Sequence, residues 1–531
     1  MFKSVYIYGL GMMGASLAKA IKNSNQSLLK ILRSGRVIYG VNTGFGKLSS
    51  VPIESKDLKK LQLNLVRSHA AGTGKPFDLG ITRLTMALKI LTWSKGYSGV
   101  RPKLVTLLLK MINHDILPVI PRQGSVGASG DLAPLSHLAC SMIGEGMVYF
   151  NNRRISSMTA FKKAKLTPIA LEAKEGLSLI NGTQLSTAIA IKALSEACKV
   201  LLTADIVSAA SVEASLSTRE VFKPAIHRLK KHKGQLVSAK NIYSLLDKSQ
   251  IVESHKDCNK IQDPYCVRCI PHVHGASWEM FSNSEKIINN EINSVSDNPL
   301  IFPNGDVLSS GHFHAEPVAQ ALDALSIAMS EIGAISERRI HYFMKGADEQ
   351  LPLFGAVNGG LESGFMLAHV TAASLASENK TLAHPASVDS ISTSAGQEDI
   401  VSMAPWAGRS CLRIIDNVIN FMIKKGCKKK NMIAVIGPCI SQKSYNVKED
   451  FKRKFLKKDK RNKVFFKKRK NLIYFDLSKY IKSQLKLMKI TNLDTINIDT
   501  FLKKNNFFSA RRSLHLNHDD YGRNISLIMI N

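Results

Sequence analysis

Residues 124–135 read GSVGASGDLAPL, a glycine-rich loop followed by an apolar run. Glycines let this loop bend sharply. If the amide nitrogen of Gly130 reaches the carbonyl carbon of Ala128, a five-membered ring closes. Loss of water from the ring and loss of the Ser129 hydroxyl then leave an exocyclic methylidene, a strong electrophile. A side chain at Gly130 would crowd the attacking nitrogen. The alternative interpretation is a tight loop that caps a helix beginning at Asp131.

Several further motifs surround this loop in a fixed order. They read YGVNTGFG at 39–46, SHAAG at 68–72, NGTQ at 181–184, QDPY at 262–265 and SAGQED at 394–399. With these motifs, residues 27–423 resemble the histidine ammonia-lyase family. The resemblance implies a mainly α fold, a long-helix bundle of the ammonia-lyase/fumarase-like type. It also implies the prosthetic group MIO (4-methylideneimidazol-5-one), formed autocatalytically from Ala128-Ser129-Gly130.

The same resemblance assigns roles to individual side chains. The electrophile takes up the substrate amine, and a base must then remove a poorly acidic β-proton. Tyr39 matches the family's catalytic tyrosine, Tyr265 its second active-site tyrosine, and Glu398 an acidic partner near the substrate imidazole or the proton-transfer step.

Substrate-binding residues follow from the resemblance in the same way. Arg268 suits a bidentate clamp on the substrate carboxylate. Asn181 and Gln262 resemble the amides that hold this carboxylate and the prosthetic group's oxygen, and Phe313 resembles an aromatic residue that lines the site. His69 belongs to the histidine-type Ser-His pair and can hydrogen-bond an imidazole.

Three positions depart from the family pattern. His312 replaces a usual Asn, Ile400 a usual His and Cys266 a common Ser. The resemblance also stops near residue 424, so the family's closing C-terminal helices are missing. In the family, each active site combines residues from several subunits of a homotetramer.

The charge divides the 531-residue chain into three zones. Residues 424–531 hold 28 Lys and Arg against 8 Asp and Glu, a net charge of +20, and residues 1–26 carry +3. Of the total of +32, this leaves +9 for residues 27–423. We therefore interpret the asymmetry as a junction between unlike sequences rather than as a nucleic-acid-binding surface.

The N-terminal zone, residues 1–26, predicts a truncated Rossmann-like βα fragment. An apolar strand at 5–8 precedes GLGMMG at 9–14, a GxGxxG motif, and the segment resembles the opening of a prephenate dehydrogenase. Dinucleotide folds hold the ribose with an acidic residue about 20 positions later. The first acid here is Glu54, so we predict no NAD site.

The central zone reads as helical. Residues 183–216, 320–340 and 364–378 predict buried helices, and Pro102 suits the first turn of a helix over 103–113. No apolar run reaches the length of a membrane span. Eight cysteines in a chain of this length make no disulfide scaffold. We therefore expect a cytoplasmic protein without a membrane partner.

The C-terminal zone, residues 424–531, predicts an α/β fragment with strands at 432–436, 472–477 and 525–530. It resembles the C-terminal half of the laccase-like polyphenol oxidase family, also described as purine nucleoside phosphorylases. Their metal ligands lie in a half that is missing here, and His515 and His518 do not match them, so no metal is assigned. Lysines interleaved with Phe465, Phe466, Phe507 and Phe508 would suit nucleic acid, but we favour a solvated surface.

Together these observations predict a lyase that converts L-histidine to urocanate and ammonia, built as a homotetramer. Two alternatives stay open at this point. One is an inactive or unstable gene fusion without a competent assembly. The other is an MIO lyase or aminomutase that acts on another aromatic amino acid.

Overall fold

The computed structural model describes residues 12–258, 260–424, 432–436, 441–469, 471–487, 492–495, 499 and 528–530. The chain forms two compact units, Met1–Ile419 and Asn420–Asn531. Helices dominate the first unit, which confirms the predicted mainly α fold. The strand predicted at 5–8 lies outside the described residues. The first helix, α1, spans Met12–Arg33 and crosses residue 26, the predicted end of the N-terminal fragment.

Short helices and small sheets make up the N-terminal part of the first unit. After α1 the helices are α2 (Leu58–His69), α3 (Leu79–Ser94), α4 (Pro102–Asn113), α5 (Leu132–Met142), α6 (Ser157–Ala164) and α7 (Glu175–Ile180). Antiparallel pairs join β1 (Thr73–Pro76) to β3 (Pro121–Gln123), and β4 (Met147–Phe150) to both β2 (Leu117–Pro118) and β5 (Arg153–Ser156). Pro102 stands at the start of α4, as predicted, because proline needs no hydrogen-bond partner there.

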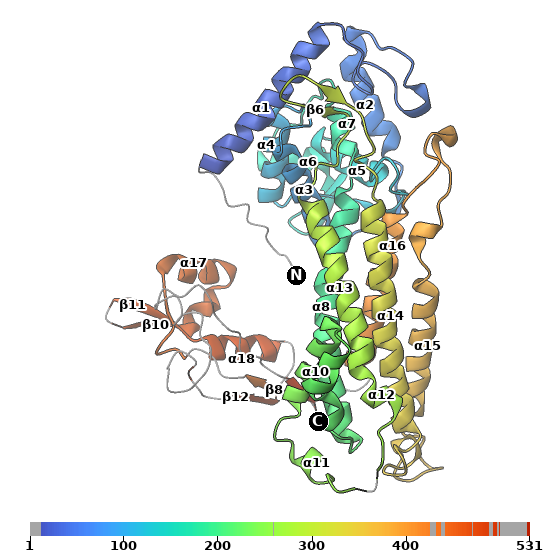
Figure 1. The fold of residues 1–531 in the computed structure, drawn as a ribbon. Helices are drawn as coiled ribbons and strands as arrows, with labels where there is room; N and C mark the ends of the chain where they lie inside the picture. Colours follow the sequence, from blue (N-terminus) through green and yellow to red (C-terminus); the bar gives the residue numbers. More distant parts are fainter. Residues whose placement is uncertain are drawn as a thin grey trace. The chain divides into compact units, whose positions relative to one another are not determined.

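Long helices form a bundle beside this part (Figure 1). They are α8 (Gln184–Ala214), α10 (Lys233–Leu245), α13 (Ile270–Ile292), α14 (Glu316–Met344), α15 (Met366–Leu382) and α16 (Ala404–Lys424). Helix α13 packs against α8, α10 and α14, and α14 packs against α15. The buried helices predicted at 183–216 and 320–340 are confirmed as α8 and α14. The helix predicted at 364–378 is present as α15, but its predicted burial is wrong for the single chain, in which only Ala372 and Asn379 of this helix are buried.

Shorter elements connect the bundle. They are α9 (Pro224–Leu229), α11 (Gln250–Glu253), α12 (Tyr265–Arg268), the hairpin of β6 (Leu300–Ile301) with β7 (Val307–Leu308), and the 3-10 turns η1 (Gly46–Leu48), η2 (Ser55–Asp57), η3 (Glu220–Phe222), η4 (Leu353–Gly355), η5 (Ala386–Val388) and η6 (Ser394–Gly396).

Apolar side chains at helical spacing explain why these segments bury one another. Leu104, Leu108 and Met111 on α4 are fully buried, and they join Met86 and Trp93 of α3 in one core. Helix α14 is long and apolar enough to cross a membrane by length and composition, but 72% of its most apolar window is buried inside the structure. A core helix of a soluble domain meets the same criteria, so this is weak evidence for a span.

The second unit is a small α/β fragment. Strand β8 (Met432–Ile436) pairs parallel with β12 (Asn492–Thr495) and antiparallel with β13 (Ile528–Ile530). A second sheet has the order β10 (Phe466–Arg469), β11 (Leu472–Phe475), β9 (Asn446–Val447), with α17 (Glu449–Lys458), η8 (Lys460–Phe465) and α18 (Leu477–Leu487) beside it in sequence. The strand predicted at 432–436 is confirmed.

Aromatic side chains from the second sheet and from α17 pack together. The rings of Phe451, Phe455, Phe466 and Phe475 contact one another, and Phe465 is buried. Packing inside the unit therefore occupies Phe465 and Phe466, which fits the interpretation of a folded piece with a Lys-rich surface. Phe507, Phe508, His515 and His518 lie outside the described residues.

Candidate active site

The glycine-rich loop is fixed at two positions where a side chain would not fit. Gly127 has φ +67, and a Cβ there would lie 2.3 Å from Ser402 Oγ, which donates to the Gly127 carbonyl over 2.9 Å. Gly130 has φ +82, and a Cβ there would lie 2.4 Å from both N and O of Gly182. The backbone between them is therefore held close to two other segments of the chain.

Asp131 ties the loop to the long helix α8. The carboxylate makes no capping bond to α5; it accepts from the Ser186 amide at 2.8 Å and from the Ser186 hydroxyl at 2.7 Å. Burial raises the pKa of Asp131 to about 6, because the hydrogen bonds from Ser186 and Ser125 offset burial only in part. Asp131 thus stands at the N-cap position of α5, as the alternative interpretation expects of the loop, but its carboxylate bonds α8 and does not cap α5.

Ser129 is contacted by polar side chains on two sides. The hydroxyl donates to Oε1 of Glu398, and the carbonyl oxygen accepts from the Asn181 side-chain amide over 3.2 Å. Burial disfavours the charged form of Glu398, but hydrogen bonds from Ser129, Thr393 and Ser394 outweigh it and hold the pKa of Glu398 below its ordinary value. Glu398 is thus a carboxylate near neutral pH and acts as an acceptor.

His69 is the last residue of helix α2. Its Nδ1 lies 2.9 Å from the Leu65 carbonyl oxygen and 3.0 Å from Ser68 Oγ. His69 also contributes electrostatically to the lowered pKa of Glu398, which places the two groups near each other. The hydrogen-bond partners of the imidazole, Leu65 and Ser68, both belong to α2.

Tyr39 and Phe313 belong to segments that adjoin the loop. The Tyr39 hydroxyl accepts from the Gly46 amide at 3.1 Å, and η1, which begins at Gly46, contacts η6 just before Glu398. Phe313 is half-buried and precedes Ala315, whose amide donates to the Gly127 carbonyl over 3.3 Å. Both segments therefore reach the surroundings of Ser129.

Gln262, Tyr265 and Arg268 lie elsewhere in the chain. Tyr265 is 73% exposed, and the Arg268 guanidinium sits 4.3 Å from the Tyr265 ring centroid. These residues precede α13, whose opposite end carries Glu291, the acceptor of a hydrogen bond from Thr183 beside the loop. A 23-residue helix is about 35 Å long. One chain therefore does not bring these three residues to Ser129 (Figure 1).

The residues around Ser129 fit a prosthetic group made from Ala128-Ser129-Gly130. Ala128 is buried, the Ser129 hydroxyl has an acceptor, and its carbonyl has a donor. Within the part of the chain that the structure describes, Asn181 Oδ1 is a buried atom with no hydrogen-bond partner. In the same part, no group of three or more His, Cys, Asp or Glu side chains could hold a metal ion.

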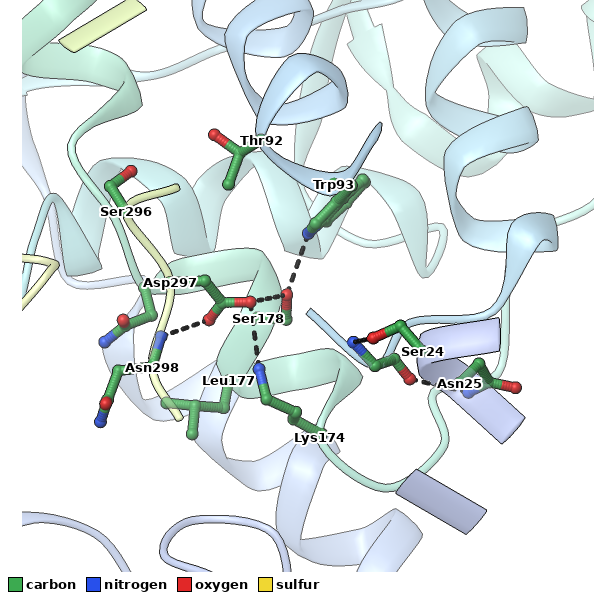
Figure 2. Close-up of polar contacts among 12 residues, drawn as sticks. Ser24, Asn25, Thr92, Trp93, Lys174, Leu177, Ser178, Ser296, Asp297 and Asn298 are labelled. Atoms are coloured by element: carbon green, nitrogen blue, oxygen red, sulfur yellow. Dashed lines mark hydrogen bonds and ion pairs between the residues drawn. The ribbon is translucent and has the colours of Figure 1, made fainter. Parts of the chain in front are cut away.

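The sequence analysis did not predict a group of buried ionisable side chains, Lys89, Lys174 and Asp297. Lys89 and Lys174 are completely buried, and Asp297 accepts from Lys174 at 3.0 Å and from the Ser178 hydroxyl at 2.7 Å (Figure 2). A lysine in an apolar run gives one usable signal, because it must find a partner or carry a large desolvation cost. The partners lie far away in sequence and cannot be read from it.

Comparison with known proteins agrees with this geometry. The sequence profile described as "Aromatic amino acid lyase" matches residues 12–422. The chain belongs to the aromatic amino acid lyase family. The match begins within residues 1–26, whose resemblance to prephenate dehydrogenase stays a prediction. A second profile, "Multi-copper polyphenol oxidoreductase laccase", matches residues 401–531, in agreement with the laccase-like resemblance of the C-terminal zone.

Individual relatives are similar to this chain over most of its length. A histidine ammonia-lyase of Vibrio cholerae is 50% identical over 392 residues, 73% of this chain and 77% of the relative. One of Burkholderia mallei is 50% identical over 404 residues, 76% of this chain and 80% of the relative.

Solved structures share the fold. The histidine ammonia-lyase of Trypanosoma cruzi is 42% identical, has a TM-score of 0.70 and covers 77% of each chain. The phenylalanine aminomutase of Pantoea agglomerans is 31% identical, with a TM-score of 0.72 over 76% of this chain and 82% of its own. The fold is therefore shared by enzymes named for different substrates.

Proposed function

We propose that this lyase eliminates ammonia from L-histidine and releases urocanate. The electrostatic proximity of His69 to Glu398, the carboxylate that accepts from Ser129, is the observation that carries the proposal. An imidazole side chain can exchange hydrogen bonds with the imidazole of the substrate. The 50% identity to histidine ammonia-lyases supports the same substrate. The alternative of another aromatic substrate has no comparable observation behind it.

The MIO group made from residues 128–130 would supply an electrophile for the substrate amine. In this proposal, the Asn181 amide stabilises negative charge on the Ser129 carbonyl oxygen. The Glu398 carboxylate accepts a hydrogen bond from the substrate or takes part in proton transfer. Tyr39 removes the β-proton of the substrate, and Phe313 lines the site.

The remaining site residues come from another copy of the chain in this proposal. Tyr265, Arg268 and Gln262 of one subunit would approach Ser129 of another, with Arg268 clamping the substrate carboxylate. Exposed apolar residues on α15 support burial in an assembly, since Leu367 and Val370 are 63% and 53% exposed. We propose a homotetramer in which residues 27–423 form the lyase core and residues 424–531 contribute nothing to the site.

The purified full chain tests this proposal. Adding L-histidine should raise the ultraviolet absorption of urocanate, and Ser129→Ala should abolish the rise. Phenylalanine and tyrosine are measured in parallel, and a higher kcat/KM for either would replace histidine as the substrate. A folded tetramer with no activity on any of the three would reject the function, and an aggregate on size exclusion would favour the unstable-fusion alternative.

A further inference from the structure

Helix α7 carries Asn181 at its C-terminal end, where a buried lysine is bound. Lys89 Nζ, on α3, donates to the Ser178 carbonyl at 2.9 Å and to the Asn181 carbonyl at 2.6 Å. Carbonyls at a helix C-terminus carry partial negative charge and attract cations. The side chain of Lys89 is completely buried, and burial lowers the pKa of its amine to about 7.

A neighbouring polar cluster shares Ser178 with Lys89. Asp297 accepts from the Ser178 hydroxyl and from Lys174, which precedes α7, and the Trp93 indole donates to the Ser178 hydroxyl over 2.9 Å (Figure 2). Lys174 thus has a carboxylate partner at 3.0 Å. The hydrogen bonds of Lys89 instead end on two carbonyl oxygens, an arrangement that compensates less of the cost of burying a cation.

The orientation of the Asn181 side chain depends on the position of its backbone. Its Nδ2 donates to the Ser129 carbonyl over 3.2 Å, but its Oδ1 has no partner among the described residues. The orientation of the amide therefore depends on the main chain, which bonds Leu177 through the Asn181 amide at 2.9 Å and Lys89 through the Asn181 carbonyl.

We propose that Lys89 is a positioning residue that fixes the Asn181 backbone, so that the Asn181 amide meets the Ser129 carbonyl oxygen. The inference rests on the proposed function, because the value of that contact lies in stabilising charge on this oxygen during the reaction. Lys89 touches no reacting atom and acts through Asn181.

Lys89→Met tests the role because it keeps the apolar stem and removes the donors. We expect kcat to fall roughly tenfold to a hundredfold, the loss that a misplacement of about 1 Å can produce. KM should change less than kcat, because the Asn181 amide donates to the Ser129 carbonyl oxygen, where charge would develop during the reaction. Each kcat is divided by the fraction of chains whose 128–130 peptide has lost two waters.

Lys174→Met is the matched control, since it also removes a buried lysine beside α7 but leaves the Asn181 contacts intact. It should lower Tm at least as much as Lys89→Met and keep most of the wild-type kcat. Lys89→Gln retains an amide donor and should fall between wild type and Lys89→Met; it takes the place of Lys89→Met if that variant does not fold.

A double-mutant cycle with Asn181→Ala separates positioning from a general loss of stability. If Lys89 acts through Asn181, Lys89→Met has little further effect on kcat in the Asn181→Ala background. The same fold-loss in both backgrounds, a wild-type kcat for Lys89→Met, or a Lys89→Gln slower than Lys89→Met would each overturn the inference. A wild-type chain inactive on histidine would instead contradict the proposed function.

Discussion

The hydroxyl of Ser129 donates a hydrogen bond to the carboxylate of Glu398, a residue 269 positions later in the chain. The contact joins the loop that begins α5 to the segment that precedes α16. Since hydroxyls of Thr393 and Ser394 also donate to Glu398, this carboxylate is fixed and charged near neutral pH. The pairing places an acceptor next to the atom that must leave if the loop cyclises.

Replacement of Glu398 tests the importance of that charge. Glu398→Gln keeps the size of the side chain but removes the carboxylate, and we expect kcat to fall about a hundredfold or more, the range for loss of a proton-transfer group. Thr393→Val is the control, because it removes a single donor at 2.7 Å and leaves the carboxylate in place. A Glu398→Gln enzyme with the turnover of wild type would exclude this role.

The position of Gly130 predicts that a Cβ there would clash with Gly182, and a second glycine with a similar φ separates this clash from the cost of the backbone conformation. Gly130→Ala places a Cβ 2.4 Å from the Gly182 backbone, at a residue whose φ is +82. We therefore expect the free energy of unfolding to fall by at least about 2 kcal/mol and the activity to be lost. Gly305→Ala has a similar φ of +91 but nothing within 4 Å, and should cost about 1 kcal/mol. Equal losses in the two variants, measured by chemical denaturation, would mean that contact with Gly182 is unimportant.

Asp131 predicts a specific pH dependence of stability. Burial raises its pKa to about 6 from an ordinary value of 3.8, so its contribution is fully present below pH 4 and is lost as the pH rises through 6. Asp131→Asn has no such titration. The Tm of this variant relative to wild type should therefore increase between pH 4 and pH 7, and a pH-independent difference would argue against the raised pKa.

The separation of Tyr265 from Ser129 along α13 predicts complementation between subunits. Ser129→Ala and Tyr265→Phe should each be nearly inactive alone. Co-expression of the two chains should restore part of the activity, because some sites in mixed tetramers combine an intact Ser129 with an intact Tyr265. Activity that stays at the level of the single variants would mean that both residues serve one site from the same chain.

The sequence predicted the long helices well, and it predicted long-range contacts only where a motif marked them. Helix α8 was predictable because apolar residues continue over its 31 residues, and α4 because Pro102 marks its start. Lys89 was missed because the residues that explain it, Ser178 and Asn181, lie 89 and 92 positions away. The family resemblance implied a site shared between subunits, but it did not identify Tyr265 as a residue that lies far from Ser129 within one chain, because sequence order does not show which motifs meet.

The mass of the peptide that contains Ala128, Ser129 and Gly130 tests the central claim most directly. The full chain is purified without substrate, digested and analysed by mass spectrometry, with Ser129→Ala as the control. If the loop forms the electrophile, the wild-type peptide is lighter than its sequence by the mass of two waters, and the Ser129→Ala peptide is not. An unmodified mass for the wild-type peptide from a folded protein would contradict the account.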